Sequence, residues 1–139
     1  MDEFGLCYGF KAPQTLVRQA VKTSGIDGIA LTKLDVLTGL AAVSACVAYD
    51  TPAGRTRELP IDALATATPV YETLPGWSED LAAARALTDL PATARAYVRF
   101  LEEQIEVPID IVSVGARRDE TITLRHAFAD AFALDATAR

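Results

Sequence analysis

Two stretches of the chain place apolar residues at the spacing of an amphipathic helix. The first, residues 16–24, has Arg18 and Lys22 on the face opposite its apolar residues, so we expect both charges to be solvated. Gly25 follows it, as is common where a helix ends. The second, residues 91–106, opens on a proline, which suits a first helical turn. Its apolar stripe consists of Ala94, Tyr97, Val98, Leu101 and Ile105.

Shorter apolar runs predict strands. The run at 28–37 is bounded by a glycine and a charged cluster, which predicts a strand buried on both faces. Other strand-like runs cover residues 43–49, 68–74 and 109–114. A turn signal at 51–54 makes residues 55–59 the expected return arm of a hairpin. Because the second helix leads directly into the run at 109–114, we expect an α/β fold with a mainly parallel, or alternatively mixed, sheet and flanking helices.

Polar side chains appear where the run at 28–37 loses its apolar character. Lys33 and Asp35 are two positions apart, so on a strand both side chains point to the same face. Ligands of open α/β sheets bind just outside the carboxyl ends of the strands, which is where this pair would lie. A carboxylate offers two acceptor oxygens to the N1 and N2 donors of guanine, and the stem of a lysine could cover a purine ring. The alternative is that both residues only end a strand and begin a turn, because K-x-D is a short pattern.

Composition and charge narrow the class of protein. The length of 139 residues suits one domain, and a hydrophobic content of 50% supports a packed core. The net charge of −6 makes nucleic acid and anionic membranes poor partners, so we expect neither. No apolar stretch reaches the roughly 18 residues of a membrane span, and no signal-peptide layout is present, so we expect a cytoplasmic protein. Cys7 and Cys46 are expected as reduced thiols, and the lone His126 supports neither a metal site nor a catalytic triad.

Four sequence blocks together resemble the C-terminal part of adenylosuccinate synthetases, the GTP-dependent ligases that join IMP and aspartate in purine biosynthesis. The blocks are LVRQAVKTSG at 16–25, LTKLDVL at 31–37, VYETLPGWS at 70–78 and IVSVG at 111–115. The resemblance covers residues 16–122. It implies the C-terminal portion of a P-loop-NTPase-like ligase fold. It also implies that the guanine base of GTP is held by Lys33, Leu34, Asp35, Ser113, Val114 and Gly115.

The resemblance further implies what this sequence lacks. In the family, the phosphate loop, the catalytic Asp and His, the Mg²⁺ ligands and the contacts to IMP and aspartate lie upstream of the blocks seen here. This sequence has no G-x-x-x-x-G-K-[ST] loop, so we assign no catalytic residue and no metal ligand. We therefore expect a fragment that reads guanine but is inactive alone, from a family whose full-length members are usually homodimers. The alternative is a non-catalytic guanine-nucleotide-binding module, or a structural remnant that kept its fold and lost its ligand.

The resemblance divides the chain into a divergent segment at 1–15, a guanine-nucleotide-binding region at 16–124 and a tail at 125–139. Within the middle region, Gly115 either serves a turn or lets the backbone approach a flat ring closely. Ala116 departs from the family, which usually has proline there. Arg117 and Arg118 could meet a phosphate or stay solvated. Trp77 could be a ligand platform, although a tryptophan after a Pro-Gly turn is more often a packing anchor.

Overall fold

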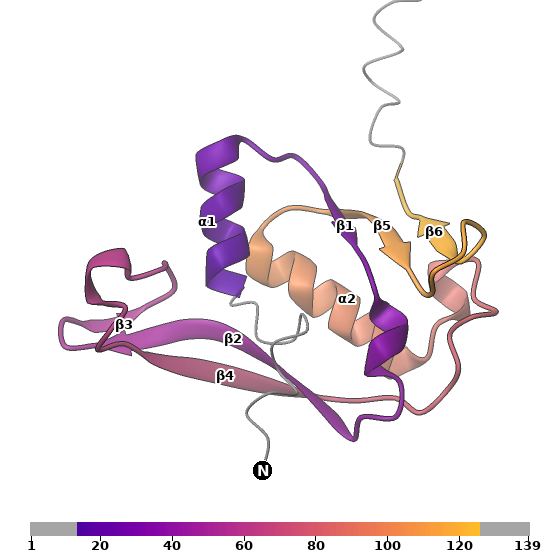
Figure 1. Ribbon diagram of the computed structural model, residues 1–139, viewed down its shortest axis with the longest axis horizontal. Helices are drawn as coiled ribbons and strands as arrows, with labels where there is room; N and C mark the ends of the chain where they lie inside the picture. Colours follow the sequence, from indigo (N-terminus) through magenta and orange to yellow (C-terminus); the bar gives the residue numbers. More distant parts are fainter. Residues whose placement is uncertain (1–13, 126–139) are drawn as a thin grey trace, which may run out of the picture.

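The computed structural model describes residues 14–125, so Cys7, His126 and nearly all of the expected segments 1–15 and 125–139 lie outside the described residues. The helices and strands are shown in Figure 1. The helices are α1 (Gln14–Ser24) and α2 (Ala92–Ile105), with 3₁₀ turns η2 (Leu34–Leu37), η3 (Ile61–Ala63) and η4 (Leu87–Asp89). The strands are β1 (Ile29–Leu31), β2 (Ala42–Thr51), β3 (Gly54–Thr56), β4 (Thr68–Pro75), β5 (Ile109–Ser113) and β6 (Thr121–Thr123).

The strands form two sheets rather than one. In the first sheet, of order β1-β5-β6, β1 runs parallel to β5 with Leu31 opposite Val112, and β6 runs antiparallel to β5. The second sheet, of order β3-β2-β4, is antiparallel throughout. The expectation of a mainly parallel sheet is therefore wrong, and the mixed alternative describes the first sheet. The fold class α/β is confirmed. The mainly parallel expectation rested on the helix before β5, whereas the hairpin expected after residues 51–54 already makes β2 and β3 antiparallel neighbours.

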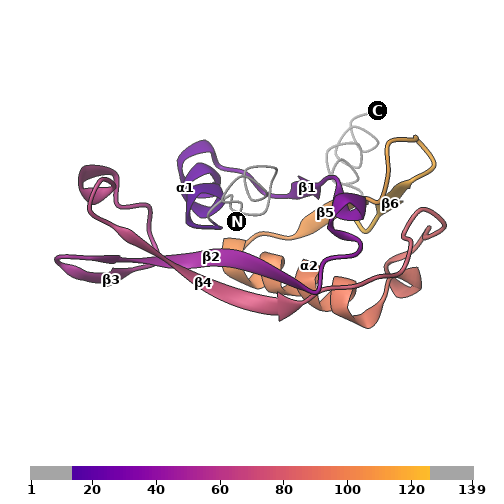
Figure 2. The same ribbon diagram turned by 60° about the horizontal axis from the view of Figure 1, so that its bottom comes forward.

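The long ribbon of β2 and β4 runs along one side of α2, and the strands of the first sheet lie on the other (Figure 1). In both views, α1 lies on the same side of the ribbon as β1 and β5 (Figure 2). One buried cluster joins these elements, because residues from α2, η2 and both sheets belong to it. The predicted stripe on α2 is confirmed, since all of its residues are buried: Ala94, Tyr97, Val98, Leu101 and Ile105.

Expectations about four side chains have different outcomes. Trp77 is a packing anchor as expected, because its side chain is 3% exposed and its ring centroid lies 5.9 Å from that of Tyr97. Cys46 is a free, buried thiol on β2. Lys22 is exposed as predicted, but the same prediction for Arg18 is wrong, because Arg18 is only 3% exposed. The reason is tertiary: the face of α1 that carries Arg18 packs toward α2.

No helix within residues 14–125 is both long enough and apolar enough to cross a lipid bilayer.

Candidate functional site

The two segments predicted to hold a ligand follow adjacent parallel strands. β1 ends at Leu31 and β5 ends at Ser113, and the two strands pair in parallel. Parallel strands end at the same edge of a sheet, so residues 33–35 and 113–115 both begin there. The turn η2, which contains residues 34 and 35, also packs against β5 (Figure 1). The pairing that the sequence could not specify is thus what brings the two segments together.

The local geometry of Lys33 and Asp35 differs from the expectation. β1 is only three residues long and partly exposed rather than buried on both faces. Lys33 adopts the left-handed conformation, with φ 61° and ψ 39°, and residues 34–37 form the turn η2. Lys33 and Asp35 therefore do not share one face of a strand. The physical reason is the burial of Leu34 and Leu37, since a 3₁₀ turn aligns positions i and i+3, whereas a strand would point them to opposite faces.

The six predicted residues differ in what their side chains can contact. Leu34 and Val114 are each 1% exposed and belong to the core, so their side chains anchor the two segments, and only their backbones could face a ligand. Lys33 is exposed and Asp35 is half-buried. The carbonyl oxygen of Asp35 accepts a hydrogen bond from the Thr38 N–H (3.0 Å), which closes η2.

The segment after β5 is closed by hydrogen bonds of its own. The Ser113 hydroxyl donates to the Gly115 carbonyl oxygen (2.7 Å), and the Val114 N–H donates to the Glu120 carbonyl oxygen (2.8 Å). A Cβ on Gly115 would overlap the Glu120 carboxylate, so the absence of a side chain at position 115 is what allows the carboxylate its present position. Sequence reasoning did not single out Glu120. The signal that could have found it is Gly115, whose missing side chain leaves space for a neighbour.

The charges that follow this segment are largely paired. Asp119 lies 3.1 Å from the guanidinium of Arg85 and 3.4 Å from that of Arg117. Arg117 is therefore committed in part to Asp119, although its side chain stays mostly exposed. Arg118 is exposed and forms no ion pair with another residue of the described range. Of the two arginines considered as phosphate contacts, Arg118 is thus the more available.

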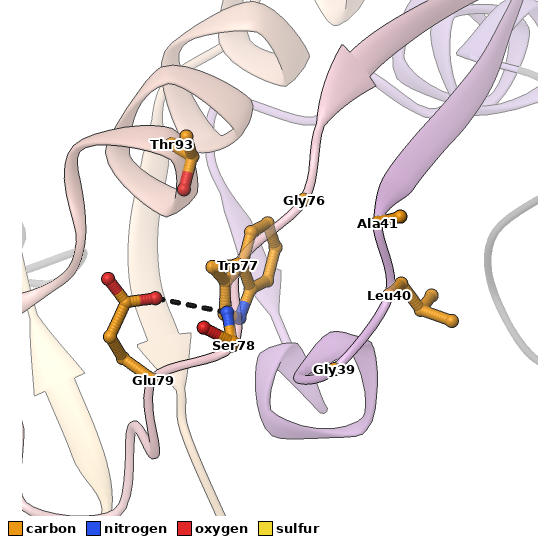
Figure 3. A pocket seen from close by; sticks show the side chains of 8 residues that line it. All are labelled: Gly39, Leu40, Ala41, Gly76, Trp77, Ser78, Glu79 and Thr93. Atoms are coloured by element: carbon orange, nitrogen blue, oxygen red, sulfur yellow. Dashed lines mark hydrogen bonds between the residues drawn. The ribbon is translucent and has the colours of Figure 1, made fainter.

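A surface depression lies elsewhere, between the end of η2 and the end of β4 (Figure 3). Its volume is about 410 Å³, and it lies where the two segments pair, since the Gly39 N–H donates to the Trp77 carbonyl oxygen (2.8 Å) and the Gly76 N–H to that of Ala41 (3.0 Å). It is lined by Gly39, Leu40, Ala41, Gly76, Trp77, Ser78, Glu79 and Thr93. A second depression, beside η3, is lined by residues between 51 and 63 together with Gln19. Neither depression is lined by any of the six predicted residues. Within residues 14–125, no group of three or more His, Cys, Asp or Glu side chains could hold a metal ion.

Three comparisons with known proteins point to the same family. A model of the adenylosuccinate synthetase family matches residues 13–122. The chain is 60% identical over 113 residues to the adenylosuccinate synthetase of Sorangium cellulosum (strain So ce56), covering 81% of this chain and 26% of that protein. It is 52% identical over 116 residues to the adenylosuccinate synthetase of Marinobacter nauticus, covering 82% of this chain and 27% of that protein.

A solved structure agrees with these sequence matches. The fold is similar to that of the fully ligated adenylosuccinate synthetase from Plasmodium falciparum, with a TM-score of 0.70 and 29% sequence identity. That match covers 78% of this chain and 28% of the other. The chain thus spans about a quarter of the length of the curated relatives that it matches.

Proposed function

Because this chain belongs to the adenylosuccinate synthetase family, we propose that it carries the guanine-recognition part of a GTP-dependent ligase that joins IMP to aspartate. That reaction belongs to the AMP branch of purine nucleotide biosynthesis. The observation that carries the proposal is the parallel pairing of β1 with β5, because it lets residues 33–35 and 113–115 follow strands that end at one sheet edge. Neither segment alone offers groups on two sides of a base.

Asp35 is the proposed reader of the base. Its two carboxylate oxygens can accept from the N1 and N2 donors of guanine, whereas adenine presents an acceptor at N1. A hydrogen bond to a charged group contributes about 1.5–3 kcal/mol, so Asp35 would favour guanine over adenine by a few kcal/mol. Asp35 lies in the first turn of η2, next to the buried Leu34, which anchors the backbone from which the carboxylate extends.

The other five residues have supporting roles in the proposal. Lys33, which is exposed, would lay its alkyl stem along the purine ring. Leu34 and Val114 would hold their segments in the core and offer only backbone groups to the base. Ser113 and Gly115, which are joined by a hydrogen bond of 2.7 Å, would close the opposite side of the base.

The chemistry of the ligase would require groups that the proposal does not assign to this chain. Phosphoryl transfer needs backbone amides around the phosphates, a metal ion and a group that activates the nucleophile. The residues described here form no metal-binding cluster, so the Mg²⁺ of the family reaction would be held by other parts of the full-length enzyme, as would IMP and aspartate. We propose that the chain alone binds guanine nucleotide weakly and makes no adenylosuccinate. We further propose a cytoplasmic location and a homodimeric full-length enzyme.

Titration of the 139-residue chain with a fluorescent GDP analogue tests the proposal. We expect saturable binding that unlabelled GDP reverses at concentrations at least about tenfold lower than ADP, a ratio set by one charged hydrogen bond. Asp35→Ala should abolish binding. Asp62→Ala is the matched control, because it removes an exposed carboxylate on η3, outside both segments.

Three outcomes would count against the proposal. Binding that survives Asp35→Ala would show that Asp35 does not recognise the base. An equal loss of GDP affinity in Asp62→Ala would show that the effect of Asp35→Ala is one of surface charge. Absence of saturable binding up to millimolar GDP would leave only a structural or interaction role for the isolated chain.

A further inference from the structure

Glu120 makes hydrogen bonds at both ends of the turn that follows β5. The Val114 N–H donates to the Glu120 carbonyl oxygen (2.8 Å), and the Glu120 N–H donates to the Arg117 carbonyl oxygen (3.1 Å). The Arg117 N–H donates in turn to Oε2 of the Glu120 side chain (2.7 Å). The first of these bonds lies where the strand ends, and the other two lie at the far side of the turn. Glu120 therefore closes the turn with both its backbone and its side chain.

The carboxylate of Glu120 lies directly against the backbone of Gly115. A Cβ at position 115 would overlap this carboxylate. Gly115 is not among the residues with positive φ, so its backbone conformation is one that other residues adopt readily. The glycine is therefore needed for the approach of Glu120 and not for the turn itself. Gly115 and Glu120 form a matched pair, in which the missing side chain of one makes room for the carboxylate of the other.

Ion pairs of Asp119 with Arg85 and Arg117 hold the outer part of the turn, but they do not involve residues 113–115. Ala116 does not restrict φ as a proline would, and residues 116–119 are exposed. The Ser113 hydroxyl is already committed to the Gly115 carbonyl oxygen. Among the described residues, the Glu120 carboxylate, which accepts from the Arg117 N–H, is therefore the side chain that links the outer half of the turn to Gly115.

We infer that Glu120 is a positioning residue for guanine recognition. It holds the backbone of residues 113–115 in the conformation that meets the base, without itself touching the nucleotide. The inference rests on the proposed guanine site. If Glu120 had only a structural role, its loss would lower the free energy of unfolding but leave the Kd of the folded chain for GDP unchanged.

Three substitutions of Glu120 separate the effect of its charge from that of its side-chain length, or reach. Glu120→Ala removes the acceptor, Glu120→Gln keeps an acceptor oxygen at the same reach without the charge, and Glu120→Asp keeps the charge but is one methylene shorter. The matched control is Glu103→Ala, which removes an exposed carboxylate from α2. The Kd for the fluorescent GDP analogue is measured well below the unfolding temperature of each variant. Amide hydrogen exchange is followed at Arg117 and, as an internal reference, at Leu101.

Glu120→Ala and Glu120→Asp should raise the Kd for GDP about tenfold, the factor expected when one hydrogen bond no longer holds the site. Exchange at Arg117 should become faster while exchange at Leu101 stays unchanged. Glu120→Gln should stay within about threefold of the wild type, and Glu103→Ala should match it. If Glu120→Ala fails to fold, the inference is tested by comparing the Kd of Glu120→Asp with that of Glu120→Gln.

A wild-type Kd in both Glu120→Ala and Glu120→Asp would overturn the inference while leaving the guanine site intact. Binding by Glu120→Gln as weak as that of Glu120→Asp would also overturn it, because the charge would then matter as well as the reach, as for a carboxylate that contacts the base itself. A wild-type chain that does not bind GDP at all would overturn the proposed function first, and this result is recognised before any substitution is made.

Discussion

The guanidinium of Arg18, on α1, donates a hydrogen bond to the backbone carbonyl of Gln104, in the last turn of α2. It also donates to the carbonyl oxygen of Arg57 (3.1 Å), and its Nε lies 3.4 Å from a carboxylate oxygen of Glu106. Burial lowers the pKa of the Arg18 guanidinium, and the nearby Arg57 lowers it further, whereas Glu106 raises it. A buried cation thus joins the two helices to the segment after β3.

Arg18→Ala should lower the free energy of unfolding by about 2–4 kcal/mol, because two carbonyl groups would lose their donor in a buried setting. Lys22→Ala, which removes an exposed charge from the same helix, should change it by less than about 0.5 kcal/mol. Urea-induced unfolding followed by circular dichroism measures both. Equal effects of the two substitutions would mean that the burial of Arg18 contributes nothing to stability.

Asp35→Asn should shift the preference of the chain from guanine toward xanthine. The amide of asparagine offers a donor where xanthine carries a carbonyl at position 2, and guanine then meets a donor where it needs an acceptor. We expect the affinity for GDP to fall and the affinity for XDP to rise, each by roughly tenfold or more, because a charged hydrogen bond contributes about 1.5–3 kcal/mol. Competition of each diphosphate against the fluorescent analogue gives the two affinities. Equal loss of both would show that Asp35 does not read the base.

The indole of Trp77 should report unfolding but not nucleotide binding. It is the single tryptophan of the chain, is buried, and packs against Tyr97 with ring planes inclined by 49°. Intrinsic fluorescence should therefore stay constant through a GDP titration and change on urea unfolding. Trp77→Ala should lower the free energy of unfolding by about 3–5 kcal/mol. Trp77→Phe should lower it less, because the Nε1 atom has no hydrogen-bond partner among residues 14–125. Quenching by GDP would restore Trp77 as a ligand platform.

Stability should fall steeply at alkaline pH because of Tyr97. Burial raises the pKa of Tyr97 from 10.0 to about 12. Above pH 10 the unfolded chain therefore loses this proton before the folded chain does. The stability that Tyr97 contributes is complete below pH 10 and is lost progressively up to about pH 12. Tyr97→Phe should flatten the fall over this window by about 2–3 kcal/mol, measured by urea unfolding at each pH. Parallel pH curves for the two proteins would contradict this.

The elements that could be predicted from sequence are those whose residues carry their own periodicity. The stripe from Ala94 to Ile105 specifies both the helix α2 and its buried face, and the Pro-Gly-Trp sequence marks the end of β4 with an anchored indole. The family could be identified in the same way, because its blocks keep their order and spacing along the chain. Each of these features can be recognised from short stretches of consecutive residues, without knowing which distant segments are in contact.

Features that depend on contacts between distant segments required the tertiary structure. The order of residues shows that positions 33–35 and 113–115 follow apolar runs, but the parallel pairing of those runs is a property of the fold. The fold also decided that the burial of Leu34 and Leu37 turns the backbone into η2, that Arg18 is buried, and that Gly115 receives the Glu120 carboxylate. The physical reason is that periodicity records which side of a segment is apolar, whereas packing decides which other segment covers that side and what local conformation results.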